Sequence, residues 1–178
     1  MLPTAWEQTG NIGLGAGPYD QRVAETRHDV LCNTSDPLPE RLEVTGPLRL
    51  VLFACSSALD TDFTGKLVDV WPDGRAEILC DGIRRARYRN GLDTPSLLDP
   101  GRVYEISIEV GATSTVFPPG HRIRLDVSSS NFPRFDANTD TGGAIADDGP
   151  DAFVVAVNRV FHDPVRSSHL LLPVIDRR

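Results

Sequence analysis

The sequence predicts an all-β protein, a β-sandwich of the jelly-roll kind, and three observations support this fold class. Apolar and polar residues alternate with a period of two in several segments, most regularly in YEISIEV at residues 104–110. The chain contains 15 glycines and 14 prolines, which divide it into short segments. No segment carries a sustained apolar stripe at the 3.6-residue period of a helix. About eight short strands separated by turns are typical of two packed sheets.

The length and composition set limits on the organisation and on the function. A chain of 178 residues can form one domain with a sizeable core. We divide it into an N-terminal lead-in, residues 1–16, and a jelly-roll domain, residues 17–178. The net charge of −7 and the lack of a large basic cluster argue against nucleic-acid binding. There is neither an apolar run of 18 residues nor a basic start followed by an apolar run, so we expect no membrane span and no signal peptide.

The first strands are predicted from alternation and turn residues. In the N-terminal part, residues 29–32 form one short candidate strand. In LRLVLFA, residues 48–54, apolar side chains lie on both faces, which is typical of a strand near the centre of a sandwich. Residues 66–71 and 75–79 are predicted to form a hairpin around Pro72, Asp73 and Gly74, where the glycine allows a positive φ. Residues 83–88 are a further candidate strand, with Arg85, Arg87 and Arg89 on one solvated face.

The second half of the chain continues the same pattern. Residues 104–110 and 121–130 alternate regularly and are separated by a Pro-Pro-Gly turn. Residues 131–150 form a long polar loop, and residues 154–162 and 169–175 are predicted to be two closing strands. The predicted core consists of the inward residues of the three most regular strands: Leu50, Leu52, Ile106, Ile108, Ile123, Leu125 and Val127.

A search for catalytic motifs assigns no catalytic residue and no cofactor-binding residue. The nucleophile elbow G-x-S-x-G is absent, as are the glycine-rich cradles for phosphates and dinucleotides. Ser128, Ser129 and Ser130 could join His121 and an aspartate in a triad, because triads assemble in space. We prefer a structural interpretation, in which the serine hydroxyls bond the backbone at a turn and His121 makes a hydrogen bond at a strand end.

The acidic residues and the cysteines were considered as metal or acid–base groups. Asp136, Asn138 and Asp140 have the spacing of a calcium loop, but Thr141 stands where its sharp turn needs glycine, so we expect a polar loop. Asp60 and Asp62 are expected to cap backbone groups or to pair with arginine. The three cysteines are far apart and odd in number, so we assign no disulfide and no metal site. Free buried thiols indicate a reducing compartment, and we expect a cytoplasmic protein.

Several long segments, taken together, resemble one family of hydrolases. They are GPYDQR from residue 17, VTGPLRL from residue 44, SSALDTDFTGKLVDVWPDGRA from residue 56, DGIRRARYR from residue 81, PPGHRIRLDVSSSNFPRFDANTDTGG from residue 118 and SSHLLLPVI from residue 167. In this order they are similar to the C-terminal domain of the X-prolyl dipeptidyl-peptidase and cocaine esterase (CocE/NonD) serine hydrolases. The resemblance runs from residue 17 to the C-terminus.

The resemblance implies a non-catalytic domain of a larger enzyme that acts on esters, amides or X-Pro peptides. Members of the family have an α/β-hydrolase domain, a helical cap and this jelly roll, which is similar to galactose-binding domains. The catalytic triad lies in the α/β-hydrolase domain, so no catalytic residue is carried over to this chain. The implied partner is that domain, on which the jelly roll packs and whose active-site cleft it helps to wall.

We expect Trp6, Ile12 and Leu14 to belong to a segment that faces the partner domain or its cleft. They stand among glycines and have no periodicity that would seat them in the sandwich. Without the partner they would be exposed, or would be covered in a self-contact such as a homodimer. The alternative, equally open from the sequence, is that Trp6 folds back onto an edge of the sandwich. Two other functions remain open at this stage: a stand-alone domain that binds carbohydrate or another ligand, and an autonomous hydrolase with a hidden triad.

Overall fold

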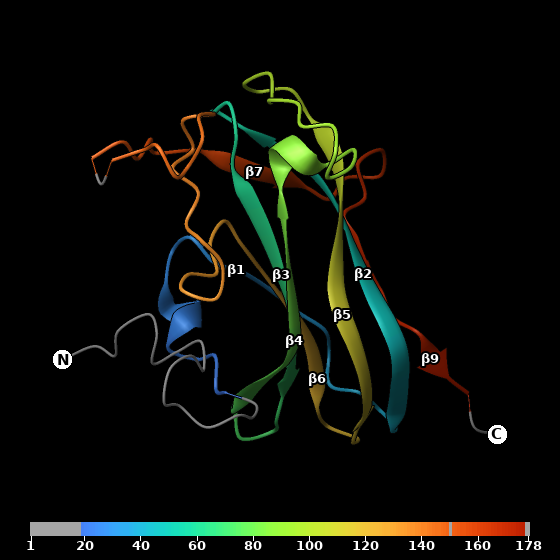
Figure 1. The fold of residues 1–178 in the computed structure, drawn as a ribbon. Helices are drawn as coiled ribbons and strands as arrows, with labels where there is room; N and C mark the ends of the chain where they lie inside the picture. The colour runs from blue at the N-terminus through green and yellow to red at the C-terminus, as the bar shows by residue number, and fades with distance from the viewer. Residues whose placement is uncertain (1–18, 150, 177–178) are drawn as a thin grey trace.

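The computed structural model describes residues 19–149 and 151–176, which form two antiparallel sheets packed face to face (Figure 1). This confirms the predicted all-β fold class. The first sheet has four strands, in the spatial order β1 (Leu31–Thr34), β6 (Arg122–Ser128), β3 (Asp62–Val70) and β4 (Ala76–Arg85). The predicted hairpin joins β3 to β4, with Gly74 at a φ of 89° and its N–H donating to the carbonyl of Trp71 at 2.9 Å. The first strand lies two residues later than the sequence predicted.

The second sheet is built around β2, which is 15 residues long. One edge of β2 pairs with β5, and the other edge pairs in succession with three short strands. The bounds are β2 (Leu42–Ser56), β5 (Tyr104–Phe117), β7 (Asn158–Phe161), β8 (His169–Leu171) and β9 (Val174–Ile175). Three short strands thus share one edge of β2.

The core lies between the two sheets and contains the alternate residues that the sequence placed there. Five of the seven predicted core residues are buried: Leu50, Leu52, Ile106, Ile108 and Val127. Ile123 and Leu125 contact the core but are only partly buried, contrary to the prediction. Their strand, β6, lies near the edge of its sheet with only the four-residue β1 beyond it, so the inward face there is incompletely covered.

The strand predicted at residues 83–88 is correct only for residues 83–85. β4 continues without interruption from Ala76 to Arg85, and residues 86–88 turn into the 3₁₀ helix η2 (Ala86–Tyr88). Gly82 does not interrupt the strand; it lies where the backbone of β4 comes close to the backbone of β5. A Cβ atom at this position would lie 1.9 Å from the carbonyl oxygen of Glu109. The glycine is therefore needed because the backbones of the two sheets meet here, at one side of the sandwich.

The two predicted closing strands are also corrected. Residues 154–157 have no strand structure, and β7 begins only at Asn158. The last predicted strand is divided into β8 and β9 by Pro173, which has no N–H to donate to a ladder. Three short strands therefore close the second sheet in place of two.

The helical content of residues 19–149 and 151–176 is limited to η1 (Ala24–Thr26) and η2. No helix in these ranges has the length and the apolar character that crossing a membrane requires.

Candidate functional site

The segment expected to face a partner, with Trp6, Ile12 and Leu14, lies outside the described residues. The other residues considered from the sequence can be placed. They lie at the two ends of β6, in the loop that follows β6, and at the start of β3. The structure adds an apolar surface beside η1 and a polar cluster beneath η1.

The serines and the histidine considered as a triad lie at opposite ends of β6. His121 precedes the strand and Ser128 ends it, and seven extended residues span roughly 20 Å. The buried imidazole of His121 has Nδ1 2.9 Å from Oδ1 of Asp69, and its ring is 4.9 Å from that of Trp71. Burial raises the pKa of Asp69, and the hydrogen bond with His121 opposes this. His121 therefore has the structural hydrogen bond that the sequence predicted.

The serine hydroxyls stabilise a turn, as predicted. Ser128 donates to the carbonyl of Ser130 at 3.1 Å, and its hydroxyl also lies 2.6 Å from that of Thr64. The hydroxyl of Ser130 accepts from the N–H of Phe132 at 3.3 Å. These contacts are local backbone and strand-end bonds of the kind that serine makes where a strand leads into a turn.

Asp60 and Asp62 are buried and pair with arginine, which confirms the structural interpretation of these residues. Nε of Arg87 donates to Asp60 at 2.6 Å, and Nε of Arg85 donates to Asp62 at 2.9 Å. The two arginines were predicted on a solvated strand face, and this prediction is wrong. Arg85 stands directly opposite Asp62 in the β3–β4 ladder, and Arg87 lies in η2, from which it reaches Asp60.

The polar loop at residues 131–149 is anchored on this cluster. Asn138 donates to Asp60 at 3.1 Å and to Asp62 at 2.9 Å, and its own side-chain oxygen accepts from the N–H of Asp140. Arg87 also donates to the carbonyl of Gly143 at 2.8 Å. The side-chain oxygen of Asn138 is thus used within the loop, which is polar as we predicted.

Asp140 is the member of this loop whose ionisation the structure perturbs most. Its φ is +61°, a conformation that aspartate and asparagine tolerate better than most residues. Burial raises its pKa to about 6, a hydrogen bond with Thr61 opposes the shift, and the charges of Asp62 and Asp60 reinforce it.

Apolar side chains gather beside η1 and the start of β1, on the surface that we call the apolar face. Leu31 is 49% exposed, Phe132 54% and Val157 58%. Two adjoining cavities of about 270 and 310 Å³ lie among them, and both are lined by Asp29 and Ser128. The neighbouring segment adds three further exposed apolar residues, Phe153, Val154 and Val155. Exposed apolar side chains gathered on one surface often mark an interaction site.

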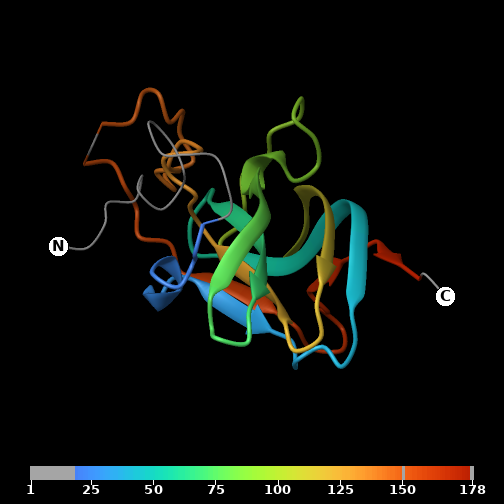
Figure 2. The same ribbon diagram turned by 90° about the horizontal axis from the view of Figure 1, so that it is seen from below.

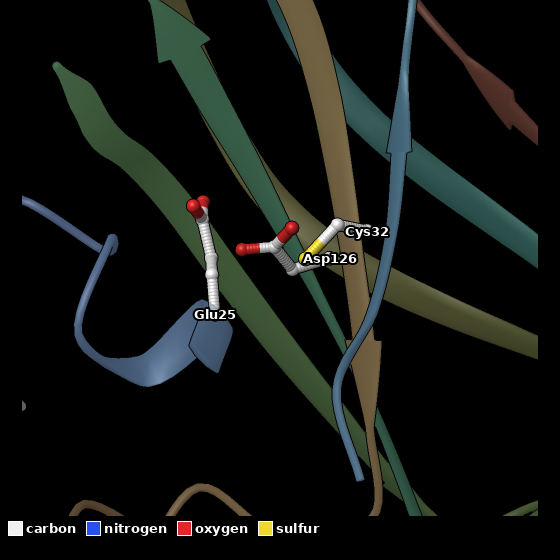
Figure 3. Close-up of side chains that lie close together, drawn as sticks. All are labelled: Glu25, Cys32 and Asp126. Atoms are coloured by element: carbon white, nitrogen blue, oxygen red, sulfur yellow. The ribbon is translucent and has the colours of Figure 1, made fainter. Parts of the chain in front are cut away.

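A polar cluster lies beneath η1, on the outer side of the first sheet (Figure 3). Glu25 comes from η1, Cys32 from β1 and Asp126 from β6, where Cys32 and Asp126 stand directly opposite each other. One donor atom from each residue lies within 4.8 Å of the others. Burial is the main reason that the pKa of Cys32 rises to about 12 and that of Asp126 to about 6.

The sequence did not indicate this cluster, because its members come from separate elements with no fixed spacing. One signal was present: Asp126 alternates with Leu125 and Val127 in a regular strand, which places a carboxylate on the opposite face. Cys32 was predicted to be a buried thiol, but the residue is exposed. The strand position explains this, since β1 is a short edge strand.

Comparison with known families matches residues 6–171 to the X-Pro dipeptidyl-peptidase C-terminal non-catalytic domain. A curated relative, the cocaine esterase of Rhodococcus sp. (strain MB1 Bresler), is 53% identical over 161 residues. This alignment covers 90% of the chain but only 28% of the esterase.

Solved structures agree with this result. An aminopeptidase from a marine sediment Thaumarchaeota archaeon superposes with a TM-score of 0.84 and 35% identity, over 88% of this chain and 27% of that one. An α-amino acid ester hydrolase superposes with a TM-score of 0.81 and 32% identity, over 89% and 27% of the two chains. The chain thus spans little more than a quarter of the length of these relatives. It belongs to the X-Pro dipeptidyl-peptidase C-terminal domain family, the non-catalytic β-sandwich of CocE/NonD-type serine hydrolases.

Proposed function

We propose that this domain packs through its apolar face on the α/β-hydrolase domain of its enzyme and helps to wall the active-site cleft. The enzyme would cleave esters, amides or X-Pro peptides, in line with the names of the family and of the relatives. A cytoplasmic location, expected from the sequence, is part of the same proposal.

The observation that supports this proposal most strongly is the apolar face itself. Phe132 and Val157 are more than half exposed, and each lines one of the two adjoining cavities. Burying such side chains against a second domain contributes about 25 cal/mol for each Å² removed from water. Cavities among exposed apolar side chains also offer recesses that side chains of a partner can fill.

The position of the face also fits a partner that precedes the domain in the chain. η1 and β1 are the first elements described, and each borders one cavity, η1 through Ala24 and β1 through Leu31. In Figure 1 these elements and the segment after β6 lie on the same side of the sandwich, and Figure 2 agrees. A catalytic domain joined to the N-terminal side of the jelly roll would meet this face without a long connection.

A chimera can test the proposal. The segment of the Rhodococcus cocaine esterase that aligns with this chain, 28% of its length, would be replaced by the present sequence. We expect the chimera to hydrolyse an activated ester. Phe132→Asp and Val157→Asp should then lower both the melting temperature and kcat/KM of the chimera, because each places a charge in the buried interface.

Val165→Asp is the matched control, since Val165 is 87% exposed and lies between β7 and β8, where it lines neither cavity. In the isolated domain all three substitutions should leave the melting temperature nearly unchanged. An interface elsewhere would be indicated if the two apolar-face variants behaved like the control in the chimera.

A further inference from the structure

We propose that Glu25, Cys32 and Asp126 form a zinc site, in which the sulfur of Cys32 and one carboxylate oxygen from each acid bind a Zn²⁺ ion and water completes the coordination. The site is independent of the function proposed above, because it lies within the described domain and uses none of the residues assigned to the apolar face.

The distances between the donor atoms suit zinc. In a tetrahedral site, Zn–S bonds of about 2.3 Å and Zn–O bonds of about 2.0 Å place neighbouring ligand atoms about 3–4 Å apart. The three donor atoms already lie within 4.8 Å of one another before any ion draws them together. In Figure 3 the carboxylate of Asp126 lies between the carboxylate of Glu25 and the sulfur of Cys32. Small side-chain rotations would therefore complete the site.

Unpartnered oxygens are a second and independent indication of a ligand. Oε1 of Glu25 and Oδ1 of Asp126 are buried and have no hydrogen-bond partner among the described residues. Asp126 is only 3% exposed. A buried carboxylate oxygen without a donor is costly, and such groups are rare in native proteins. A metal ion bound by these two oxygens would remove that cost at both residues.

The surrounding charges can hold a zinc ion with three anionic ligands. Nη1 of Arg124 donates to the other oxygen of Glu25 at 2.6 Å, which fixes the orientation of that carboxylate. Lys66 stands opposite Asp126 on β3. The Zn²⁺ ion with two carboxylates and a thiolate carries a net charge of −1, and the positive charges of Arg124 and Lys66 offset it. Partners that orient metal ligands in this way are a regular part of zinc sites.

The thiol of Cys32 favours zinc over hard divalent ions, and the exposed side of the site lets the ion enter from solvent. Thiolate sulfur favours zinc over magnesium and calcium, which prefer oxygen ligands alone. Cys32 is exposed, so the ion and a coordinating water can reach the site from solvent. On binding, the Cys32 thiol releases its proton to the solvent and the thiolate sulfur forms the bond to zinc.

Occupation of the site would tie η1 to the first sheet. Glu25 is the only ligand from η1, and the other two come from neighbouring strands of the sheet. Zinc would thus act as a cross-link that holds the start of the described chain against β1 and β6. Since η1 also borders one of the cavities of the apolar face, the ion would stiffen that border.

The test uses the tag-free chain, freed of metal with a chelator and titrated with Zn²⁺ and, separately, with Co²⁺ as a spectroscopic substitute. We expect binding of one ion per chain, a rise in melting temperature with zinc, and a sulfur-to-cobalt charge-transfer band. Cys32→Ser should abolish the band. Asp126→Asn should weaken zinc binding by about 100-fold or more, since loss of even an outer partner costs about 10–100-fold.

Cys80→Ser is the control, because Cys80 is also a free thiol of this sheet but belongs to no such cluster among the described residues. It should leave the charge-transfer band and the affinity unchanged. Asp126→Asn should also fold without zinc at least as stably as the wild type, because it removes an unsatisfied carboxylate. The proposal fails if the wild type shows no charge-transfer band, or if Cys32→Ser and Cys80→Ser bind cobalt alike.

Discussion

At the residue scale, the most consequential feature is a set of buried and partly buried carboxylates, in which the cost of burial is compensated in two ways. Asp60 and Asp62 are neutralised by Arg87 and Arg85. Asp140 responds instead with a pKa raised to about 6. The stability of the domain therefore depends on the arginine partners of Asp60 and Asp62, and it depends on pH through the ionisation of Asp140.

The Asp60–Arg87 pair yields a prediction about stability. Arg87→Ala should destabilise the domain by about 3–5 kcal/mol, because it leaves the fully buried Asp60 carboxylate without its counter-ion. Arg102→Ala is the control, since Arg102 pairs with Asp99 on the surface and both side chains are about two-thirds exposed. Urea unfolding should show no measurable effect for the control. Equal midpoints for the two variants would mean that the buried pair contributes no more than a surface pair.

Asp140 yields a prediction about pH. Its pKa in the folded protein is about 6, above the ordinary 3.8, so the unfolded state ionises first as the pH rises. The stability that the protonated form provides is therefore lost between about pH 4 and pH 6. Asp140→Asn removes this loss and tolerates the positive φ, so it should stabilise the domain at neutral pH by about 1 kcal/mol, allowing for solvent screening.

The measurement is unfolding by urea at neutral pH and at about pH 4, where the advantage of the variant should shrink toward zero. A constant difference at both pH values would show that the substitution acts through packing and not through ionisation of Asp140.

At the scale of elements, Gly74 and Gly82 lie in one hairpin but are required for different reasons. Gly74 has a φ of 89° and open space around it, so its role is conformational. Gly82 sits where β4 crosses β5, and any side chain there would collide with the backbone at Glu109. The same residue type thus serves a turn at one end of β4 and the contact between the sheets near the other.

A pair of alanine substitutions can separate these roles. Gly82→Ala should destabilise the domain by about 3 kcal/mol or more, because the added methyl group meets backbone that cannot move without opening the sandwich. Gly74→Ala should cost only about 1 kcal/mol, the strain of a positive φ. Thermal unfolding of both variants in one buffer gives the comparison. A larger loss for Gly74→Ala would contradict the close packing of β4 on β5.

At the scale of the whole molecule, the domain presents an apolar face but no assembled nucleophile among its described residues. Ser128 and His121 lie at opposite ends of β6, and His121 is already bonded to Asp69. We therefore expect the isolated chain to leave activated esters unhydrolysed above the buffer rate and to resist fluorophosphonate labelling. The active chimera proposed above is the positive control. Labelling of Ser128, Ser129 or Ser130 in stoichiometric amount would contradict the prediction.

The sequence alone was sufficient for the fold class, the family and most of the core. Alternation with a period of two indicates which face of a strand is buried, so Leu50, Leu52, Ile106 and Ile108 could be assigned without coordinates. The turn at Gly74 was predicted for a similar reason, because only local backbone chemistry decides it. Family resemblance depends on long ordered motifs and likewise needs no structure.

Only the tertiary structure decided what the polar residues do. Arg85 pairs with Asp62 because the register of β3 and β4 places the two residues directly opposite each other, and Arg87 reaches Asp60 from η2. No periodic pattern in the sequence encodes either contact. Glu25, Cys32 and Asp126 become neighbours because β1 pairs with β6 across more than ninety residues of sequence. Local patterns of apolar and polar residues indicate which side chains are buried. The partners of a buried charge depend on distant segments brought together in folding, so they became visible only in the folded chain.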